Sequence, residues 1–151
     1  MEFNAADIFE GVVKRIPDRE AVVLGDTRLT YRQLDARANK AAHALQKLNI
    51  SKGSHIGIYA FNCIEWLEIM LGAYKLCAIP ININYRYVEE ELKYLIDNAD
   101  MEAVFFHKQF SEKLNNISGD LPLLKTFVSI EDGSDIKSCL LYTSDAADEV
   151  V

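Results

Sequence analysis

Short apolar segments alternate with helical segments from residue 54 onward, and this alternation limits the chain to few folds. Four segments have the length and continuous apolar character of strands, at 54–60, 78–82, 102–107 and 125–130. Consecutive strands joined by helices form right-handed crossovers, which make neighbouring strands parallel. Because these segments are apolar throughout, we expect helices to cover both faces of the sheet.

The residues before the alternating region predict a helix, a hairpin and a second helix. The apolar spacing over 4–16 is helical, and Pro17 ends it. Gly25 and Asp26 lie between two apolar stretches, as in the tight turn of a β-hairpin. Thr30 and Gln33 have the spacing of a capping box and begin a helix that extends to about residue 48. The apolar stripe of this helix consists of Leu34, Ala38, Ala41, Leu45 and Leu48.

The helices between the strands complete the predicted fold. Asn62 and Glu65 have cap spacing, and the helix that follows is apolar on most sides, as in a buried helix. The acidic run at 89–91 favours the start of another helix. A weak helix over 108–116 follows the third strand, and we interpret 115–122 as a surface loop. The prediction is an α/β fold with a mainly parallel sheet flanked by helices, preceded by a helix and a β-hairpin.

The composition excludes several classes of protein. The formal net charge is -7 and no basic cluster is interleaved with aromatic residues, so we expect no nucleic-acid partner. No apolar run reaches the roughly 20 residues of a membrane span, and the N-terminus lacks the basic and apolar regions of a signal peptide. We therefore expect a cytoplasmic protein without an integral membrane segment. Cys63, Cys77 and Cys139 are widely spaced, which predicts neither a disulfide framework nor a zinc site.

The residues alone reveal no catalytic centre and no metal site. Neither the GxGxxG nor the GxxxxGK[ST] phosphate-binding motif occurs, and no serine lies in a GxSxG context. His43, His55 and His107 share no metal-ligand spacing, so we interpret them as structural or surface residues. We therefore predict no catalytic residue and no metal ligand.

The most distinctive polar group is Asn82, Asn84, Tyr85 and Arg86, directly after the second of the four predicted strands. Ligands of open α/β sheets bind beyond the carboxyl ends of the strands. The asparagines are also typical of a turn in which their side chains bond to nearby backbone groups. Both interpretations stay open, and Arg86 is the residue that we predict to bind a cofactor.

Several motifs, in the right order over residues 5–130, resemble those of the adenylate-forming superfamily, the AMP-dependent synthetases and ligases. In that family a Leu-Thr-Tyr-x-x-Leu segment ends the first hairpin and opens a helix. Leu29, Thr30, Tyr31 and Leu34 match this segment. The family continues with a glycine and a strand, as this chain does at 53–60.

A second motif of the family is a helix end of the form Gly-Ala-x-x-x-Gly-Ala, followed by a strand with proline. The matching residues are Gly72, Ala73, Ala78 and Pro80. Cys77 stands where the second glycine is usual, which puts the packing at this position in doubt. Asn82 stands where amino-acid adenylating domains tend to carry an aspartate. The resemblance is therefore to the acyl-CoA synthetase branch, which includes fatty-acyl-CoA ligases.

The resemblance implies an enzyme that joins a carboxylate to ATP, forming an acyl-adenylate and pyrophosphate, and then transfers the acyl group to CoA. ATP, Mg²⁺ and CoA are the implied cofactors, and the implied partner is a small carboxylic acid such as a fatty acid. The family's phosphate loop with its lysine and its C-terminal domain are not found here. We therefore expect an incomplete N-terminal part of the enzyme's large domain, which is inactive alone and binds these cofactors poorly. The alternatives are an adenylation domain that loads a carrier protein and a non-catalytic α/β binding module, and the oligomeric state is open.

The last residues of the chain depart from the family pattern. The run Tyr-Thr-Ser at 142–144 matches the start of the family's phosphate loop, but Asp145 stands where a glycine is needed. Glycines allow positive φ angles and close backbone approach in such a loop, whereas aspartates repel phosphate. Residues 139–149 also match, codon by codon, the adapter used in transposase-based sequencing libraries. We therefore predict a partial adenylate-forming domain at 1–138 and a non-native, adapter-derived tail at 139–151, whose removal would change the net charge from -7 to -4.

Overall fold

The computed structural model describes residues 3–134, so the predicted tail lies outside the described residues. The first elements are α1 (Ala5–Arg15), the antiparallel hairpin of β1 (Glu20–Leu24) and β2 (Thr27–Thr30), and α2 (Tyr31–Lys47). The side chain of Thr30 accepts a hydrogen bond from the Gln33 N–H, and the side chain of Gln33 accepts one from the Thr30 N–H. The predicted helix, hairpin and capping box are therefore confirmed. Within residues 3–134, no helix has the length and apolar character needed to cross a membrane.

The main sheet of the described chain has four parallel strands in the order β4-β3-β5-β6. Its elements are β3 (His55–Tyr59), α3 (Ile64–Lys75), β4 (Ile79–Asn82), α4 (Glu89–Asn98), β5 (Ala103–His107), η1 (Lys108–Phe110), α5 (Ser111–Ser118) and β6 (Thr126–Ile130). The chain enters the sheet at β3, adds β4 on one side, and then crosses over to add β5 and β6 on the other. The parallel sheet that the sequence predicts is confirmed.

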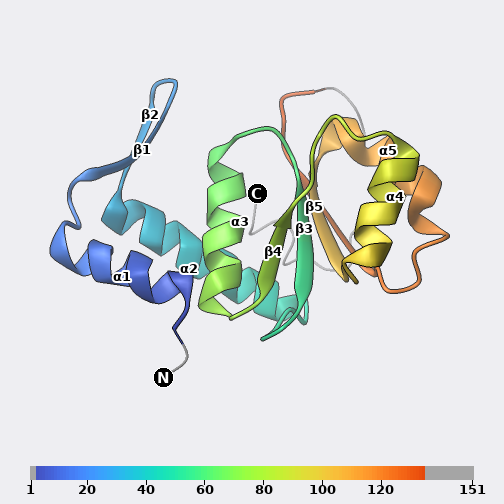
Figure 1. Ribbon diagram of the computed structural model, residues 1–151. Coiled ribbons are helices and arrows are strands. Elements are labelled where there is room, and N and C mark those ends of the chain that lie inside the picture. Colours follow the sequence, from blue (N-terminus) through green and yellow to red (C-terminus); the bar gives the residue numbers. More distant parts are fainter. Residues whose placement is uncertain (1–2, 135–151) are drawn as a thin grey trace.

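Helices cover both faces of the sheet (Figure 1), with α2 and α3 on one face and α4 and α5 on the other. On the first face, Phe105 of β5 belongs to the same core as Leu45 and Ile69. On the second face, the next residue, Phe106, belongs to a core with Leu92. Successive residues of β5 point to opposite cores, which explains why the strand is buried along its whole length.

The ends of α3 differ from the prediction in two ways. Cys63, rather than Asn62, is the N-cap residue, and the cap has no side-chain hydrogen bond. At the other end, Cys77 has a φ of 56°, in the left-handed region. The N–H groups of Cys77 and Ala78 donate to the carbonyl oxygens of Tyr74 and Ala73, which is a Schellman motif. Since Cys77 is exposed, the usual glycine at this position relieves the backbone and has no role in packing.

The prediction of a surface loop at 115–122 is wrong for 115–118, because α5 extends to Ser118, whereas 119–122 lie outside any helix or strand. Leu114, Ile117 and Leu121 are buried against the core on the α4 side of the sheet. Their spacing of three to four residues continues one apolar helical stripe. This burial outweighs the turn-like asparagine, serine and glycine residues, whose local preference favoured a loop.

Candidate functional site

The strand order creates one position where the connections of the sheet diverge. From β3 the chain passes to β4 on one side, whereas β5 and β6 lie on the other side. The carboxyl ends of β3 and β5 are therefore neighbours at a topological switch point, where open α/β sheets bind their ligands. These strands end at Tyr59 and His107. We place the candidate functional site at this position.

Aromatic side chains fill the switch point. Phe61 follows β3, and its backbone N–H donates to Nδ1 of His107 at 3.1 Å. The centre of the Phe61 ring lies 5.8 Å from the imidazole and 5.3 Å from the ring of Phe110 in η1. Tyr59 stacks on Phe110 at 4.4 Å, and Tyr85, which follows β4, lies 4.6 Å from Phe61. We call these five residues the switch-point cluster.

The switch-point cluster is buried at its base and exposed at its rim. Tyr59 is fully buried and His107 is 5% exposed, whereas Phe61 and Tyr85 each expose 38% of their surface. The Tyr59 hydroxyl has no hydrogen-bond partner among the described residues. Burial raises the pKa of Tyr59 to about 12, so this hydroxyl stays protonated at physiological pH.

The surroundings of His107 favour a neutral imidazole. Burial lowers its pKa below the usual 6.5 and outweighs the carboxylates of Asp132 and Glu65, which raise it. Because Nδ1 accepts a hydrogen bond, the proton of the neutral ring is on Nε2. Burial also acts to raise the pKa of Asp132, but hydrogen bonds from Ser134 and Gln109 prevail and lower it to about 2. The site therefore combines a neutral ring with an anion.

The predicted polar group after β4 lies at the same edge of the sheet. The side chain of Asn84 accepts a hydrogen bond from the Arg86 N–H at 3.0 Å, so the turn interpretation is confirmed for this residue. The Arg86 side chain is exposed, and its guanidinium carbon lies 5.7 Å from the centre of the Tyr85 ring. Asn82 faces a separate pocket. The cofactor-binding role of Arg86 stays a prediction.

A pocket of about 370 Å³ opens between the hairpin and the start of α3. Its lining consists of Val22, Val23, Leu24, Asn62, Cys63, Ile64, Trp66, Leu67 and Asn82. Burial raises the pKa of the Cys63 thiol to about 11, which makes it a poor nucleophile at neutral pH. An apolar cavity with a few amide groups has the character of a small-molecule site.

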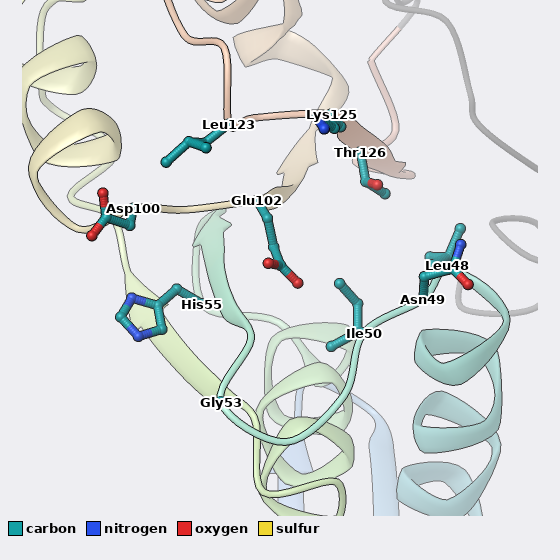
Figure 2. Close-up of a pocket in the computed structure, with 10 residues that line it drawn as sticks. All are labelled: Leu48, Asn49, Ile50, Gly53, His55, Asp100, Glu102, Leu123, Lys125 and Thr126. Atoms are coloured by element: carbon teal, nitrogen blue, oxygen red, sulfur yellow. The ribbon is translucent and has the colours of Figure 1, made fainter.

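A larger pocket of about 570 Å³ lies at the opposite edge of the sheet (Figure 2). It is lined by Leu48, Asn49, Ile50, Gly53, His55, Asp100, Glu102, Leu123, Lys125 and Thr126. Several of these residues flank the amino ends of β3, β5 and β6, whereas ligands of open α/β sheets bind at the carboxyl ends. The His55 Nδ1 donates to the Ala99 carbonyl at 2.6 Å, which gives this histidine a structural role. The carboxyl edge is therefore the better candidate.

Positive charge and clustered metal ligands among the described residues at this edge of the sheet would favour phosphate groups and metal ions. Within residues 3–134, no group of three His, Cys, Asp or Glu side chains is arranged to hold a metal ion. At the carboxyl edge, Lys108 is paired with Glu131 at 2.5 Å, and Asp132 adds a negative charge. These residues lack the concentrated positive charge that phosphate groups require.

Comparison with known proteins places this fold in a family. The family model described as AMP-binding enzyme matches residues 9–150, which is nearly the whole chain. The chain belongs to the AMP-binding enzyme family. A 3-oxocholest-4-en-26-oate–CoA ligase of Rhodococcus rhodochrous is 43% identical over 136 residues, which cover 90% of this chain and 24% of the relative. A medium/long-chain-fatty-acid–CoA/3-oxocholest-4-en-26-oate–CoA ligase of Mycobacterium marinum is 46% identical over 132 residues, which cover 87% and 24%.

A solved structure of a CoA ligase has the same fold as this chain. The anthranilate CoA ligase AuaEII, in complex with anthranoyl-AMP, superposes with a TM-score of 0.83 and 28% sequence identity. The match covers 98% of this chain and 27% of that protein. The adenylate-forming superfamily and its acyl-CoA synthetase branch, which the sequence resembles, are therefore confirmed. The chain spans about a quarter of the length of the curated relatives it matches.

Of the switch-point cluster, only Tyr85 belongs to the polar group that the sequence singles out. The residues singled out from the sequence lie at and after the end of β4, an edge strand of the described sheet; they are Asn82, Asn84, Tyr85 and Arg86. The sequence predicts His107 to be a structural or surface residue; the structure shows it buried and in contact with the loop after β3. The available signal was the aromatic residue Phe61 directly after a strand, but the neighbour of that strand was not known from the sequence.

Proposed function

We propose that the chain is the N-terminal part of an ATP-dependent acyl-CoA synthetase. The observation that carries this proposal is the 43% and 46% identity to two CoA ligases over almost all of the described residues. In the proposed reaction, a carboxylate and ATP give an acyl-adenylate and pyrophosphate, and the CoA thiol then displaces AMP to give acyl-CoA. ATP, Mg²⁺ and CoA serve the whole enzyme, and the substrate is a fatty acid or another small organic acid.

We further propose that the present chain is inactive by itself. Two observations support this: no three His, Cys, Asp or Glu side chains of residues 3–134 form a metal-binding group, and the chain spans about a quarter of the CoA ligases it matches. An ATP–pyrophosphate exchange assay with purified residues 1–151 is expected to give no turnover above a reaction without protein. Measurable exchange would overturn this part of the proposal. A cytoplasmic location remains a prediction from the N-terminal sequence.

A chimera tests the ligase function directly. In the Mycobacterium marinum ligase, the segment that matches this chain is replaced by the corresponding residues of this chain. We expect the chimera to form acyl-CoA from a medium- or long-chain fatty acid, because the two segments are 46% identical. The same ligase without the segment is the negative control. A chimera that is folded by circular dichroism but inactive would contradict the proposal.

The gene sequence separates the proposed ligase from the alternatives. A serine-, threonine- and glycine-rich loop with a lysine, encoded soon after the codon for Ser138, would support an adenylating enzyme. A stop codon at that point would instead support the non-catalytic binding module. Asn82 favours the acyl-CoA branch over an adenylation domain that loads a carrier protein.

A further inference from the structure

The hydrogen bond between Phe61 and His107 extends the contact between β3 and β5 beyond the end of their backbone ladder. The last paired residues of the two strands are Tyr59 and Phe106. Beyond them, the imidazole Nδ1 of His107 accepts the Phe61 N–H at 3.1 Å. At the switch point the hydrogen-bond acceptor is therefore a side chain, whereas along the strands the acceptors are backbone carbonyl groups.

The bond holds the backbone of the residue whose ring meets three strand ends. The ring contacts Tyr85 at 4.6 Å, Phe110 at 5.3 Å and the imidazole at 5.8 Å, so it joins the segments after β3, β4 and β5. The loop 60–63 that carries Phe61 leads directly into α3. The position of this loop therefore affects both the exposed rim of the switch-point cluster and the first turn of α3.

The bond requires a neutral imidazole. A protonated histidine carries N–H on both ring nitrogens and cannot accept a hydrogen bond. Two donors, the Phe61 N–H and the Nδ1–H, would then face each other at 3.1 Å.

We propose that His107 is a positioning residue that holds the loop 60–63 and the Phe61 ring at the switch point in its neutral form and releases them when it is protonated. This inference goes beyond the proposed ligase function, because it concerns control of the shape of the site. It is measurable in the present chain without any enzymatic activity.

The charges around the imidazole set the direction of this response. Glu65 on α3 and Asp132 after β6 favour the protonated ring, whereas burial favours the neutral ring and has the larger effect. Lys108, the next residue along the chain, is paired with Glu131. The pKa of His107 is therefore below 6.5 in the folded protein. The stabilising bond is fully present above pH 6.5 and is lost as the pH falls through the folded-state pKa.

Trp66 provides a probe for the release. It is the single tryptophan of the chain and lies in the first turn of α3, three residues after the loop 60–63 ends. We expect its fluorescence to change with a midpoint below pH 6.5 when the full chain is titrated from pH 8 to pH 5. In His107→Asn, an amide oxygen replaces Nδ1 as an acceptor that does not titrate, so the transition should disappear. His43→Gln, an exposed position on α2, is the matched control and should keep the transition.

Three outcomes of this titration would overturn the proposal. They are a transition that persists in His107→Asn, no transition in the folded wild-type chain, and a loss of the far-UV circular dichroism signal over the same range, which would indicate global unfolding.

Amide hydrogen exchange of Phe61 by NMR gives a second measurement at pH 7. His107→Phe removes the acceptor and should accelerate exchange at least tenfold, whereas His107→Asn should retain protection. Equal exchange in the wild type and a folded His107→Phe variant would also contradict the proposal.

The outcomes for this inference and for the ligase function are separable. An active chimera without a Trp66 transition in the present chain would leave the ligase function standing and overturn the role of His107. A Trp66 transition together with an inactive but folded chimera would support the role of His107 and overturn the ligase function.

Discussion

Single residues explain where this chain departs from the pattern of its family. Cys77 occupies the left-handed position after α3, with a φ of 56°. A side chain with a Cβ atom is strained there by roughly 1–2 kcal/mol, whereas glycine adopts this conformation freely. The sequence motif shows that glycine is usual at the position, and the backbone conformation supplies the reason.

Replacing Cys77 with glycine should therefore stabilise the chain. We expect Cys77→Gly to raise the free energy of unfolding by about 1 kcal/mol, because the relief of strain exceeds the added flexibility of the unfolded chain. Urea denaturation measures the change. Cys63→Gly is the control, since Cys63 has an extended φ of -151° and should gain nothing. A lower urea midpoint for Cys77→Gly would contradict the explanation.

At the scale of elements, the packing of α2 against α3 supports the first face of the sheet. Gly72 on α3 lies at the closest approach of the two helices. A Cβ atom at this position would be 2.9 Å from the Ala42 backbone nitrogen and 3.0 Å from the Ala41 Cβ. The helices therefore meet backbone to backbone, which only small residues allow.

Gly72→Ala should push the two helices apart. We expect the free energy of unfolding to fall by about 1–3 kcal/mol, as for other cases of overpacking. The matched control is Gly11→Ala in α1, where the added Cβ has no neighbour within 4 Å. That change should raise stability by roughly 0.5–1 kcal/mol, because alanine is the better helix former. Thermal or urea unfolding of both variants tests the pair, and a neutral Gly72→Ala would show that the helices adjust.

Ion pairs join the same helices. Arg37 on α2 pairs with Glu68 on α3, which is only 4% exposed. Lys75 on α3 has its Nζ 2.6 Å from Glu10 on α1 and 2.8 Å from Asp35 on α2. Burial raises the pKa of Glu68, and the contact with Arg37 opposes this effect. The Glu68 carboxylate therefore depends on its arginine.

Removal of Arg37 should have a pH-dependent cost. At pH 7 we expect Arg37→Ala to lower the free energy of unfolding by about 1–3 kcal/mol, because a buried carboxylate loses its donor. The pKa of Glu68 in the folded chain lies above 4.5. Between pH 4.5 and that pKa, the carboxyl group is protonated in the folded chain and ionised in the unfolded chain. The free energy of unfolding therefore falls as the pH rises through this range. The cost should therefore shrink as the pH approaches 4.

A surface pair provides the control for this measurement. Arg28 and Glu20 of the hairpin form an ion pair at 2.9 Å, and both side chains are more than half exposed. Arg28→Ala should change stability by no more than about 0.5 kcal/mol at either pH. Equal losses in Arg37→Ala and Arg28→Ala would show that the burial of Glu68 has no effect.

At the scale of the whole molecule, the hairpin projects from the rest of the described chain (Figure 1). β1 and β2 pair only with each other among the described residues, and Val23 and Leu24 are 52% and 47% exposed. A two-stranded hairpin with open edges is weakly stabilised and tends to associate with other strands. Under the proposed ligase function, the rest of the enzyme would cover part of the apolar surface that this chain exposes by itself.

Purified residues 1–138 should therefore bind the dye ANS and scatter light at micromolar concentration. The double variant Val23→Lys and Leu24→Lys should reduce both signals, because it places charges on the exposed apolar edge. Thr27→Lys, on the exposed part of the same hairpin, is the control for added charge alone. A monomer that binds no ANS would contradict the expectation of exposed apolar surface.

Most helices and strands of this protein were predictable from the sequence, because they depend on residues close together along the chain. The cap formed by Thr30 and Gln33, the turn at Gly25, and the apolar runs of the four strands all act within a few residues. The family was also accessible, since its motifs are short and occur in order. The helix predicted over 108–116 extends two residues further, because Ile117 continues its apolar spacing from Leu114, whereas the polar residues at 115, 116 and 118 favoured a loop.

The tertiary structure alone decided which elements meet. Alternating strands and helices imply crossovers but do not say on which side each new strand adds, so the position of the switch point between β3 and β5 was not predictable. Phe61 and His107 are 46 residues apart, and no local pattern connects them. Their contact exists because burial of the two apolar faces of the sheet selects one strand order, and that order brings the ends of β3 and β5 together.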